Sequence, residues 1–185
     1  MKFQSIPLEG AFLVSLEKRC DERGVFARTY CKNEFAAHGI AVDIMQSNIS
    51  TNKCAGIVRG MHFQRAPHAE VKLVRCIHGA IFDVIVDIRK NSLTYGQWYG
   101  VELSEDNGLM IVVPEGFAHG YQALSDGATA FYMVSTVYAP EAEGGLRYDD
   151  PALGIKWPLP VTEVSDKDRQ WALLSVDKLN TKQGS

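Results

Sequence analysis

The stretch that decides the fold is residues 81–89, Ile-Phe-Asp-Val-Ile-Val-Asp-Ile-Arg. Apolar and polar side chains alternate along most of it, which is the period-two pattern of a β-strand. One face carries Phe82, Val84, Val86 and Ile88, and the other carries Asp83, Asp87 and Arg89. The pattern predicts a strand with one packed face and one polar face.

Three further stretches predict strands around it. Residues 71–77 are rich in β-branched side chains, residues 110–113 form an apolar run that ends at a Pro-Glu-Gly turn, and residues 130–138 alternate. Tyr132 and Tyr138 would share one face of the last strand, at a separation of roughly 20 Å. Scattered glycines separate the runs, so we expect an all-β chain, folded as a sandwich or a barrel.

Helical signals are few. Asn33 can cap a short turn through His38 that Gly39 ends, and Ser165-Asp166-Lys167-Asp168 resembles a capping box before residues 171–174. We therefore expect a few short helices, mainly near the C-terminus.

Length and composition limit the class of protein. The chain has 185 residues, a hydrophobic fraction of 46% and a formal net charge of -3. These values predict one globular domain, residues 1–185, without affinity for nucleic acid. No apolar run is long enough to span a membrane and the first residues do not resemble a signal peptide, so we expect a cytoplasmic protein. The four cysteines share no C-x-x-C spacing and are expected to be reduced.

The segment Val58-Arg59-Gly60-Met61-His62-Phe63-Gln64 carries the strongest chemical signal, together with Lys72. A near-neutral imidazole at His62 can accept a proton from a carbon atom that a neighbouring carbonyl makes acidic. The ammonium of Lys72, set in an otherwise apolar strand, could stabilise the enolate that results. The alternatives are a structural histidine and an outward-facing lysine on an edge strand.

Two other residues could belong to the same site. Asp168 could orient His62, or could serve only in the capping box. His119, in Gly116-Phe117-Ala118-His119-Gly120, lies between small residues that leave room for a ligand, or is a turn histidine without a role. The five histidines contain no H-x-H or H-x-x-x-H pair, and no nucleotide-binding glycine loop occurs, so we expect no metal site and no cofactor loop.

Six segments, in order over nearly the whole chain, resemble the dTDP-4-dehydrorhamnose 3,5-epimerase family. They are Asp21-Glu22-Arg23-Gly24, Gln46-Ser47-Asn48, the 58–64 segment, Lys72-Leu73-Val74, the 116–120 segment and Asp149-Asp150-Pro151. Tyr132, Tyr138 and Ser165-x-Lys167-Asp168 add to the match. The resemblance implies a cupin-type jelly roll or β-sandwich that needs no metal or organic cofactor and forms a homodimer by exchanging strands.

The resemblance also implies a reaction. In a nucleotide-linked 4-keto-6-deoxyhexose, a proton leaves a carbon next to the C4 ketone and returns on the opposite ring face, at C5 and possibly also at C3. By similarity, His62 is the base, Asp168 orients it, Tyr132 is the acid and Lys72 lies near the enolate oxygen. The residues expected to contact the diphosphate, the sugar or the nucleotide are Arg23, Arg59, His119, Arg169, Gln46, Asn48 and Tyr138.

One position departs from the family pattern, because Arg28 stands where the family usually has glutamate. If residue 28 faces the nucleobase, glutamate suits the N3–H donor of thymine, whereas arginine suits the acceptors of cytosine. The substrate could therefore be CDP-linked, or Arg28 could point outward and leave a dTDP preference unchanged. Two other activities are open: a ketoisomerase that shares the enolate step, and a cupin that binds a sugar nucleotide without turnover.

Overall fold

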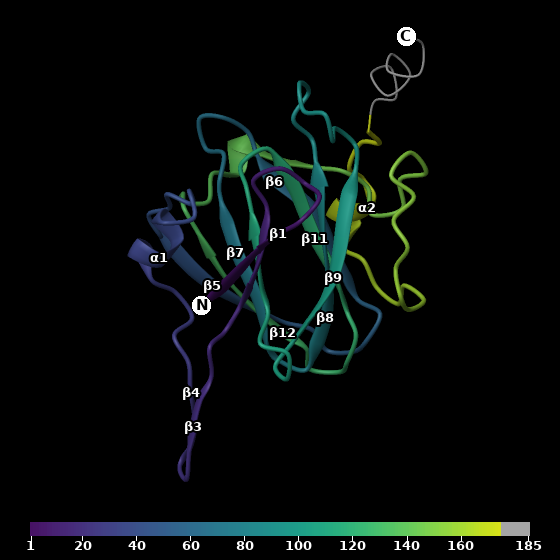
Figure 1. Cartoon of the computed structure of the whole chain (residues 1–185). Helices are drawn as coiled ribbons and strands as arrows, with labels where there is room; N and C mark the ends of the chain where they lie inside the picture. Colours follow the sequence, from purple (N-terminus) through teal and green to yellow (C-terminus); the bar gives the residue numbers. More distant parts are fainter. Residues whose placement is uncertain (175–185) are drawn as a thin grey trace.

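The computed structural model describes residues 1–174, whose strands form two sheets packed face to face (Figure 1). The six-stranded sheet has the order β1 (Lys2–Ser5), β2 (Phe12–Ser15), β10 (Met110–Val113), β7 (Lys72–His78), β12 (Thr129–Val134) and β5 (Gln46–Thr51). The five-stranded sheet has the order β13 (Glu143–Gly145), β6 (Val58–Gln64), β11 (Phe117–Ala123), β8 (Ala80–Asp87) and β9 (Trp98–Ser104). The predicted all-β sandwich is confirmed.

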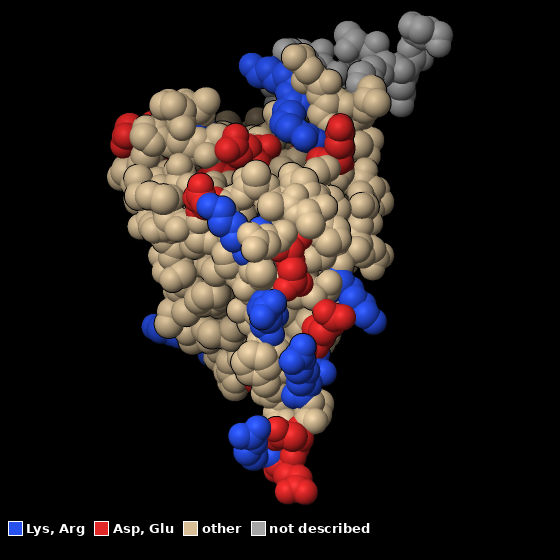
Figure 2. Space-filling view, turned by 60° about the vertical axis from the view of Figure 1, so that its left-hand side comes forward, with Lys and Arg blue, Asp and Glu red and all other residues tan. Residues whose placement is uncertain are grey.

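The remaining elements are short. Strands β3 (Arg19–Asp21) and β4 (Gly24–Phe26) form a hairpin that projects from the body, at the bottom of Figures 1 and 2. The helices are α1 (Lys32–Ala36), the 3-10 turn η1 (Pro140–Ala142) and α2 (Asp166–Arg169). None of the helices within residues 1–174 has the length and apolar character needed to cross a membrane.

The structure differs from one predicted helix start and agrees with the other. Helix α1 begins after Cys31 rather than after Asn33, and the side chain of Cys31 makes no capping hydrogen bond. Helix α2 begins after Ser165, whose Oγ accepts the Asp168 N–H at 3.1 Å, as the capping pattern predicts. The helix ends at Arg169, and Ala172 instead forms a bridge to the segment after β13.

Apolar side chains are buried in three layers. Between the sheets, Val74 of β7 and Ile85 of β8 belong to one cluster. Phe35 of α1 covers part of the outer face of the six-stranded sheet. Leu153, in the long segment after β13, packs against Val84 on the outer face of the five-stranded sheet. Both sheets are therefore covered, at least in part, on both sides.

The predicted polar face of strand β8 is wrong. Asp83 and Asp87 are fully buried, and they share their face with Ile81 and Ile85, which point into the sandwich. The opposite face is covered by the C-terminal segment, so neither side of this inner strand meets water. Alternation predicted the strand itself, but a buried aspartate is possible where a partner compensates for its lost hydration.

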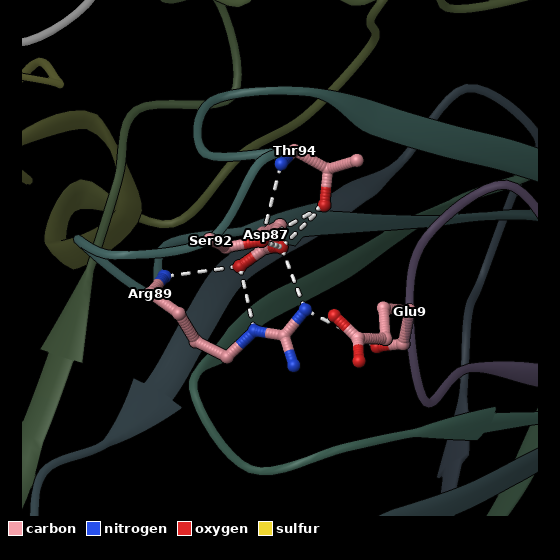
Figure 3. Close-up of polar contacts among 5 residues, drawn as sticks. All are labelled: Glu9, Asp87, Arg89, Ser92 and Thr94. Atoms are coloured by element: carbon pink, nitrogen blue, oxygen red, sulfur yellow. Dashed lines mark hydrogen bonds and ion pairs between the residues drawn. The ribbon is translucent and has the colours of Figure 1, made fainter.

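Asp87 has such partners in the loop that follows β8 (Figure 3). Its carboxylate accepts hydrogen bonds from Arg89 Nε at 2.9 Å, Ser92 Oγ at 2.5 Å and Thr94 Oγ1 at 2.6 Å. Arg89 Nη2 also donates to the backbone carbonyl of Glu9 at 3.1 Å. Burial alone would raise the pKa of Asp87, but these hydrogen bonds outweigh it and lower the pKa to about 2. The ionised carboxylate therefore fixes the loop from 88 to 97.

We predict that Asp87→Asn lowers the free energy of unfolding at pH 7 by about 2 kcal/mol, which is the size of the pKa shift expressed as an energy. Because the folded pKa is depressed, this stabilisation is present above the unfolded pKa near 3.8 and is lost as the pH falls toward 2. Denaturant titrations at several pH values should show the difference shrinking over that range.

Asp149→Asn is the matched control, because Asp149 also pairs with an arginine two residues away, Arg147, but at the surface. Its loss should cost less than about 1 kcal/mol. If the two variants lost the same free energy of unfolding, burial would not explain the stabilisation by Asp87.

Candidate functional site

A cavity of about 450 Å³ lies between the two sheets. Its walls come from both sheets and from the residues around α2. Its polar lining includes Arg59, His62, Lys72, His119, Tyr132 and Asp168. A second cavity of about 430 Å³ shares His62, Lys72 and Tyr132 with it, so the two form adjoining parts of one site.

Strand β6 presents two functional side chains to this cavity because it bulges. Arg59 and His62 are three residues apart, so a regular strand would point them to opposite faces. At Gly60 the φ angle is +119°, and a Cβ there would lie 2.6 Å from the Cα of Gly120 on β11. The register between β6 and β11 shifts at this place, so that His119 pairs with His62 and Tyr121 with Arg59.

His62 is held by Asp168 from the far end of the chain. The distance from His62 Nε2 to Asp168 Oδ1 is 2.6 Å, and the other oxygen accepts the Gly60 N–H at 3.1 Å. Trp171 Nε1 also donates to Oδ1 at 3.2 Å. Burial alone would raise the pKa of Asp168, but these hydrogen bonds and the neighbouring His62 imidazole lower it. An ionised carboxylate only accepts, so Nε2 carries the hydrogen and Nδ1 is left as the basic nitrogen.

Lys72 points inward rather than outward, and it already has a carboxylate partner. Its Nζ lies 3.1 Å from Glu70 Oε1, and the side chains are only 13% and 11% exposed. Tyr132 stands on β12 beside them and lines both cavities. Burial is the main cause that raises the pKa of its phenol, with smaller contributions from Tyr121 and Glu70. The phenol therefore keeps its proton at neutral pH.

His119 is the second histidine of the cavity and is also paired with a carboxylate. Its Nε2 lies 2.8 Å from Asp83 Oδ2, and Asp83 is fully buried. Arg59 differs, because its Nε donates at 2.9 Å to the neutral amide oxygen of Asn52.

The second cavity is lined by further predicted binding residues, which lie on β5 and after β12. Gln46, Asn48 and Tyr138 line it, together with Glu143. Strand β12 ends at Val134, so the predicted strand through 138 is wrong and Tyr138 lies in the following loop. Because the chain turns there, Tyr132 and Tyr138 line the same cavity instead of lying at opposite ends of one strand.

Three predicted binding residues lie outside both cavities. Arg23, at the tip of the projecting hairpin, is 90% exposed in its side chain and pairs with Asp21. Arg28 donates to Glu34 at 2.9 Å. Arg169, at the end of α2, is exposed. Within one chain these arginines are not brought together with His62 and Lys72.

The partners of the predicted residues were missed in the sequence. They are Asn52, Glu70, Asp83, Glu143 and Trp171. Glu143 accepts from Tyr138 at 2.7 Å and from Lys167 at 2.5 Å. Among these partners, only Asp83 could have been singled out from the sequence, because it is an acidic residue in an apolar strand. In residues 1–174, no three His, Cys, Asp or Glu side chains come together as a metal site.

This chain is similar to known proteins over most of its length. The family model for dTDP-4-dehydrorhamnose 3,5-epimerase matches residues 5–175. A relative of that name from Methanothermobacter thermautotrophicus is 45% identical over 173 residues, which is 92% of each chain. The crystal structure of the enzyme from Elizabethkingia anophelis has a TM-score of 0.92 and 37% identity, and the match covers 96% of this chain and 98% of that one. The structure from Bacillus anthracis, with TDP and PPi bound, has a TM-score of 0.91 and 39% identity, with 94% and 99% covered.

The family match, the relative and the two structures each extend over more than nine-tenths of this chain, and the fold is shared throughout. The chain therefore belongs to the dTDP-4-dehydrorhamnose 3,5-epimerase family and is an enzyme of the isomerase class.

Proposed function

We propose that this enzyme inverts C5 and C3 of a dTDP-linked 4-keto-6-deoxyhexose by removing a proton next to the C4 ketone and returning one on the opposite ring face. The observation that carries the proposal is that His62 and Tyr132 stand on different sheets and face one cavity. Inversion needs a base and an acid on opposite sides of the ring, because one group acting alone tends to return the proton to the side it left. A charged sugar nucleotide does not cross membranes unaided, which supports the expected cytoplasmic location.

In this mechanism His62 is the base. Asp168 fixes the tautomer and the ring orientation, so that Nδ1 can accept the carbon-bound proton. The imidazolium that forms lies against the carboxylate, which compensates for its charge. Positioned proton transfer of this kind contributes roughly a hundredfold or more to the rate.

Tyr132 and Lys72 complete the chemistry. Because the pKa of the Tyr132 phenol is raised, mainly by burial, the phenol is protonated and can supply the proton on the second face. The ammonium of Lys72, held in the cavity by Glu70, stabilises the negative charge that develops on the C4 oxygen. In this mechanism His119 and Arg59 bind the sugar hydroxyls and the diphosphate.

We predict that the wild-type enzyme, incubated with dTDP-4-keto-6-deoxyglucose in deuterated water, introduces deuterium at C3 and C5, as NMR would show. His62→Ala should abolish the labelling because no base remains. Tyr132→Phe should permit exchange but impair inversion, since the phenyl ring has the same shape without the acidic proton. Labelling that persists unchanged in the His62 variant would remove this residue from the mechanism.

The same samples separate the alternative activities. A ketoisomerase would yield a product with the carbonyl at another carbon, and a non-catalytic sugar-nucleotide-binding protein would leave the substrate unlabelled. The His62–Asp168 and Lys72–Glu70 arrangements support turnover, because a binding site alone does not require an oriented base.

A CDP-linked substrate is the second candidate, and the observation that favours it is the arginine at position 28. In the structure Arg28 binds Glu34 and lines neither the cavity that contains His62 and Lys72 nor the one beside it. We predict that kcat/KM is higher for the dTDP-linked than for the CDP-linked substrate. Arg28→Gln should change the ratio of the two kcat/KM values by less than about threefold, because the loss of one weak surface contact has an effect of that size. A preference for the CDP-linked substrate that disappears in Arg28→Gln would establish the second candidate.

We also infer that the enzyme is a homodimer. Ile49, Phe131 and Arg75 are register neighbours on the outer face of the six-stranded sheet, and Ile49 is 68% exposed. Arg75 Nε is buried without a hydrogen-bond partner among the described residues, and burial lowers the pKa of the guanidinium. The projecting hairpin exposes Val25 and Phe26, and much of the body in Figure 2 carries no charged side chain. A second copy of the chain would cover these apolar side chains.

We predict that the enzyme sediments as a dimer and that Ile49→Glu shifts it toward the monomer, because a carboxylate would be buried in an apolar contact. Analytical ultracentrifugation measures the effect. Leu93→Glu is the control, since Leu93 is 85% exposed in the loop between β8 and β9, away from this face. A dimer that survives Ile49→Glu unchanged would place the interface elsewhere.

A further inference from the structure

We propose that Asn52 is a positioning residue for Arg59, holding the guanidinium toward the cavity with a neutral acceptor so that the substrate diphosphate meets its full positive charge. The inference rests on the proposed function, which supplies the anionic ligand. Asn52 follows directly after β5 and touches neither cavity, so it would act only through Arg59.

The amide of Asn52 can be oriented in only one way. The residue is fully buried, and its Nδ2 donates to the Ala128 carbonyl at 2.9 Å and to the Tyr121 hydroxyl at 3.4 Å. A carbonyl requires a donor and the Nε–H of Arg59 requires an acceptor, so Nδ2 and Oδ1 cannot exchange places. The backbone N–H of Asn52 also donates to the Ala128 carbonyl, at 2.9 Å. Oδ1 is therefore a rigid acceptor aimed at Arg59.

The neutrality of this acceptor distinguishes Arg59 from two other cations of the cavity. Lys72 lies 3.1 Å from Glu70, and Lys167 lies 2.5 Å from Glu143. Across residues 1–174, Arg59 has no carboxylate within 4.0 Å. A carboxylate at position 52 would fix the guanidinium equally well but would cancel part of the charge offered to an anion. An amide fixes the side chain and leaves the charge uncompensated.

The contact also leaves the terminal nitrogens available. Arg59 Nη2 has only a long contact of 3.5 Å to the Thr51 carbonyl, and the bond from Nε to Asn52 uses the inner edge of the guanidinium. The two terminal nitrogens can then bind phosphate oxygens together. Ordering a free arginine at the moment of binding would cost roughly two- to tenfold in affinity, and Asn52 removes that cost in advance.

A double-mutant cycle tests the role of Asn52. We expect Asn52→Ala to raise the Kd for dTDP, measured by calorimetry, and the KM for the keto sugar by about tenfold, with kcat changed less than about twofold. In an Arg59→Ala background the same substitution should have no further effect. An equal effect in both backgrounds would show that Asn52 acts through the fold and would overturn the proposal. Asn107→Ala, which removes a hydrogen-bonding asparagine from the turn between β9 and β10, controls for lost stability.

Asn52→Asp tests neutrality separately. It keeps an acceptor in the same place but adds a negative charge, so dTDP binding should weaken, and more so at low salt. If the Asn52→Asp variant bound dTDP as tightly as the wild-type enzyme, the proposal that a neutral acceptor preserves the charge of Arg59 would be contradicted.

Crystals of the wild-type enzyme with dTDP provide a test that depends on no variant and decides the matter should the variants fail to fold. Arg59 Nε is expected to stay bonded to Asn52 Oδ1 while the terminal nitrogens bind the diphosphate. An Arg59 that has left Asn52 in the complex would overturn the inference. Absence of proton exchange by the wild-type enzyme would instead overturn the proposed reaction, so the two failures are distinguishable.

Discussion

The site depends on the close approach of β6 and β11, where two glycines face each other. A Cβ at Gly60 would lie 2.6 Å from the Cα of Gly120, and a Cβ at Gly120 would lie 2.7 Å from the carbonyl oxygen of Arg59. The bulge that results turns Arg59 and His62 to the same side of the sheet and frees the Gly60 N–H to bind Asp168. One backbone irregularity thus places Arg59, which we propose binds the anion, places His62, the proposed base, and anchors the carboxylate that contacts it.

The sequence predicts the architecture well because it is governed by alternation and turn residues, which are local. The sandwich, β8 and the cap at Ser165 follow from such patterns. The failures are non-local. Asp83 and Asp87 looked like a polar face, yet β8 is covered on both sides. Asp83 pairs with His119 on the neighbouring strand, whereas the partners of Asp87 lie in the loop that follows β8. Strand β12 ends at Val134, although the alternation of side chains continues through Tyr138.

The sequence predicted some residues of the site and missed others, again because contacts between distant segments leave no local pattern. His62, Lys72, His119, Tyr132 and Asp168 meet in one cavity, as the resemblance implied. Their partners could not be predicted, because Glu70 and Asn52 are ordinary polar residues until the fold brings them within hydrogen-bonding distance of Lys72 and Arg59. The arginines on the hairpin and on α2 lie outside the cavities of their own chain, and no property of one isolated chain assigns them a ligand.

Charge balance explains how so many ionisable groups share one cavity. His62 faces Asp168, His119 faces Asp83 and Lys72 faces Glu70, so each of these three groups has a carboxylate partner, whereas Arg59 has only the neutral amide of Asn52. Unmatched charges in a partly buried site would be costly, and each pair removes most of that cost locally. The pairs also fix direction, since each carboxylate leaves one end of its partner facing the cavity. Because His62 and Tyr132 belong to different sheets, their separation is set by the packing of the layer between those sheets. We therefore infer that the sandwich core sets the separation between the proposed base, His62, and the proposed acid, Tyr132.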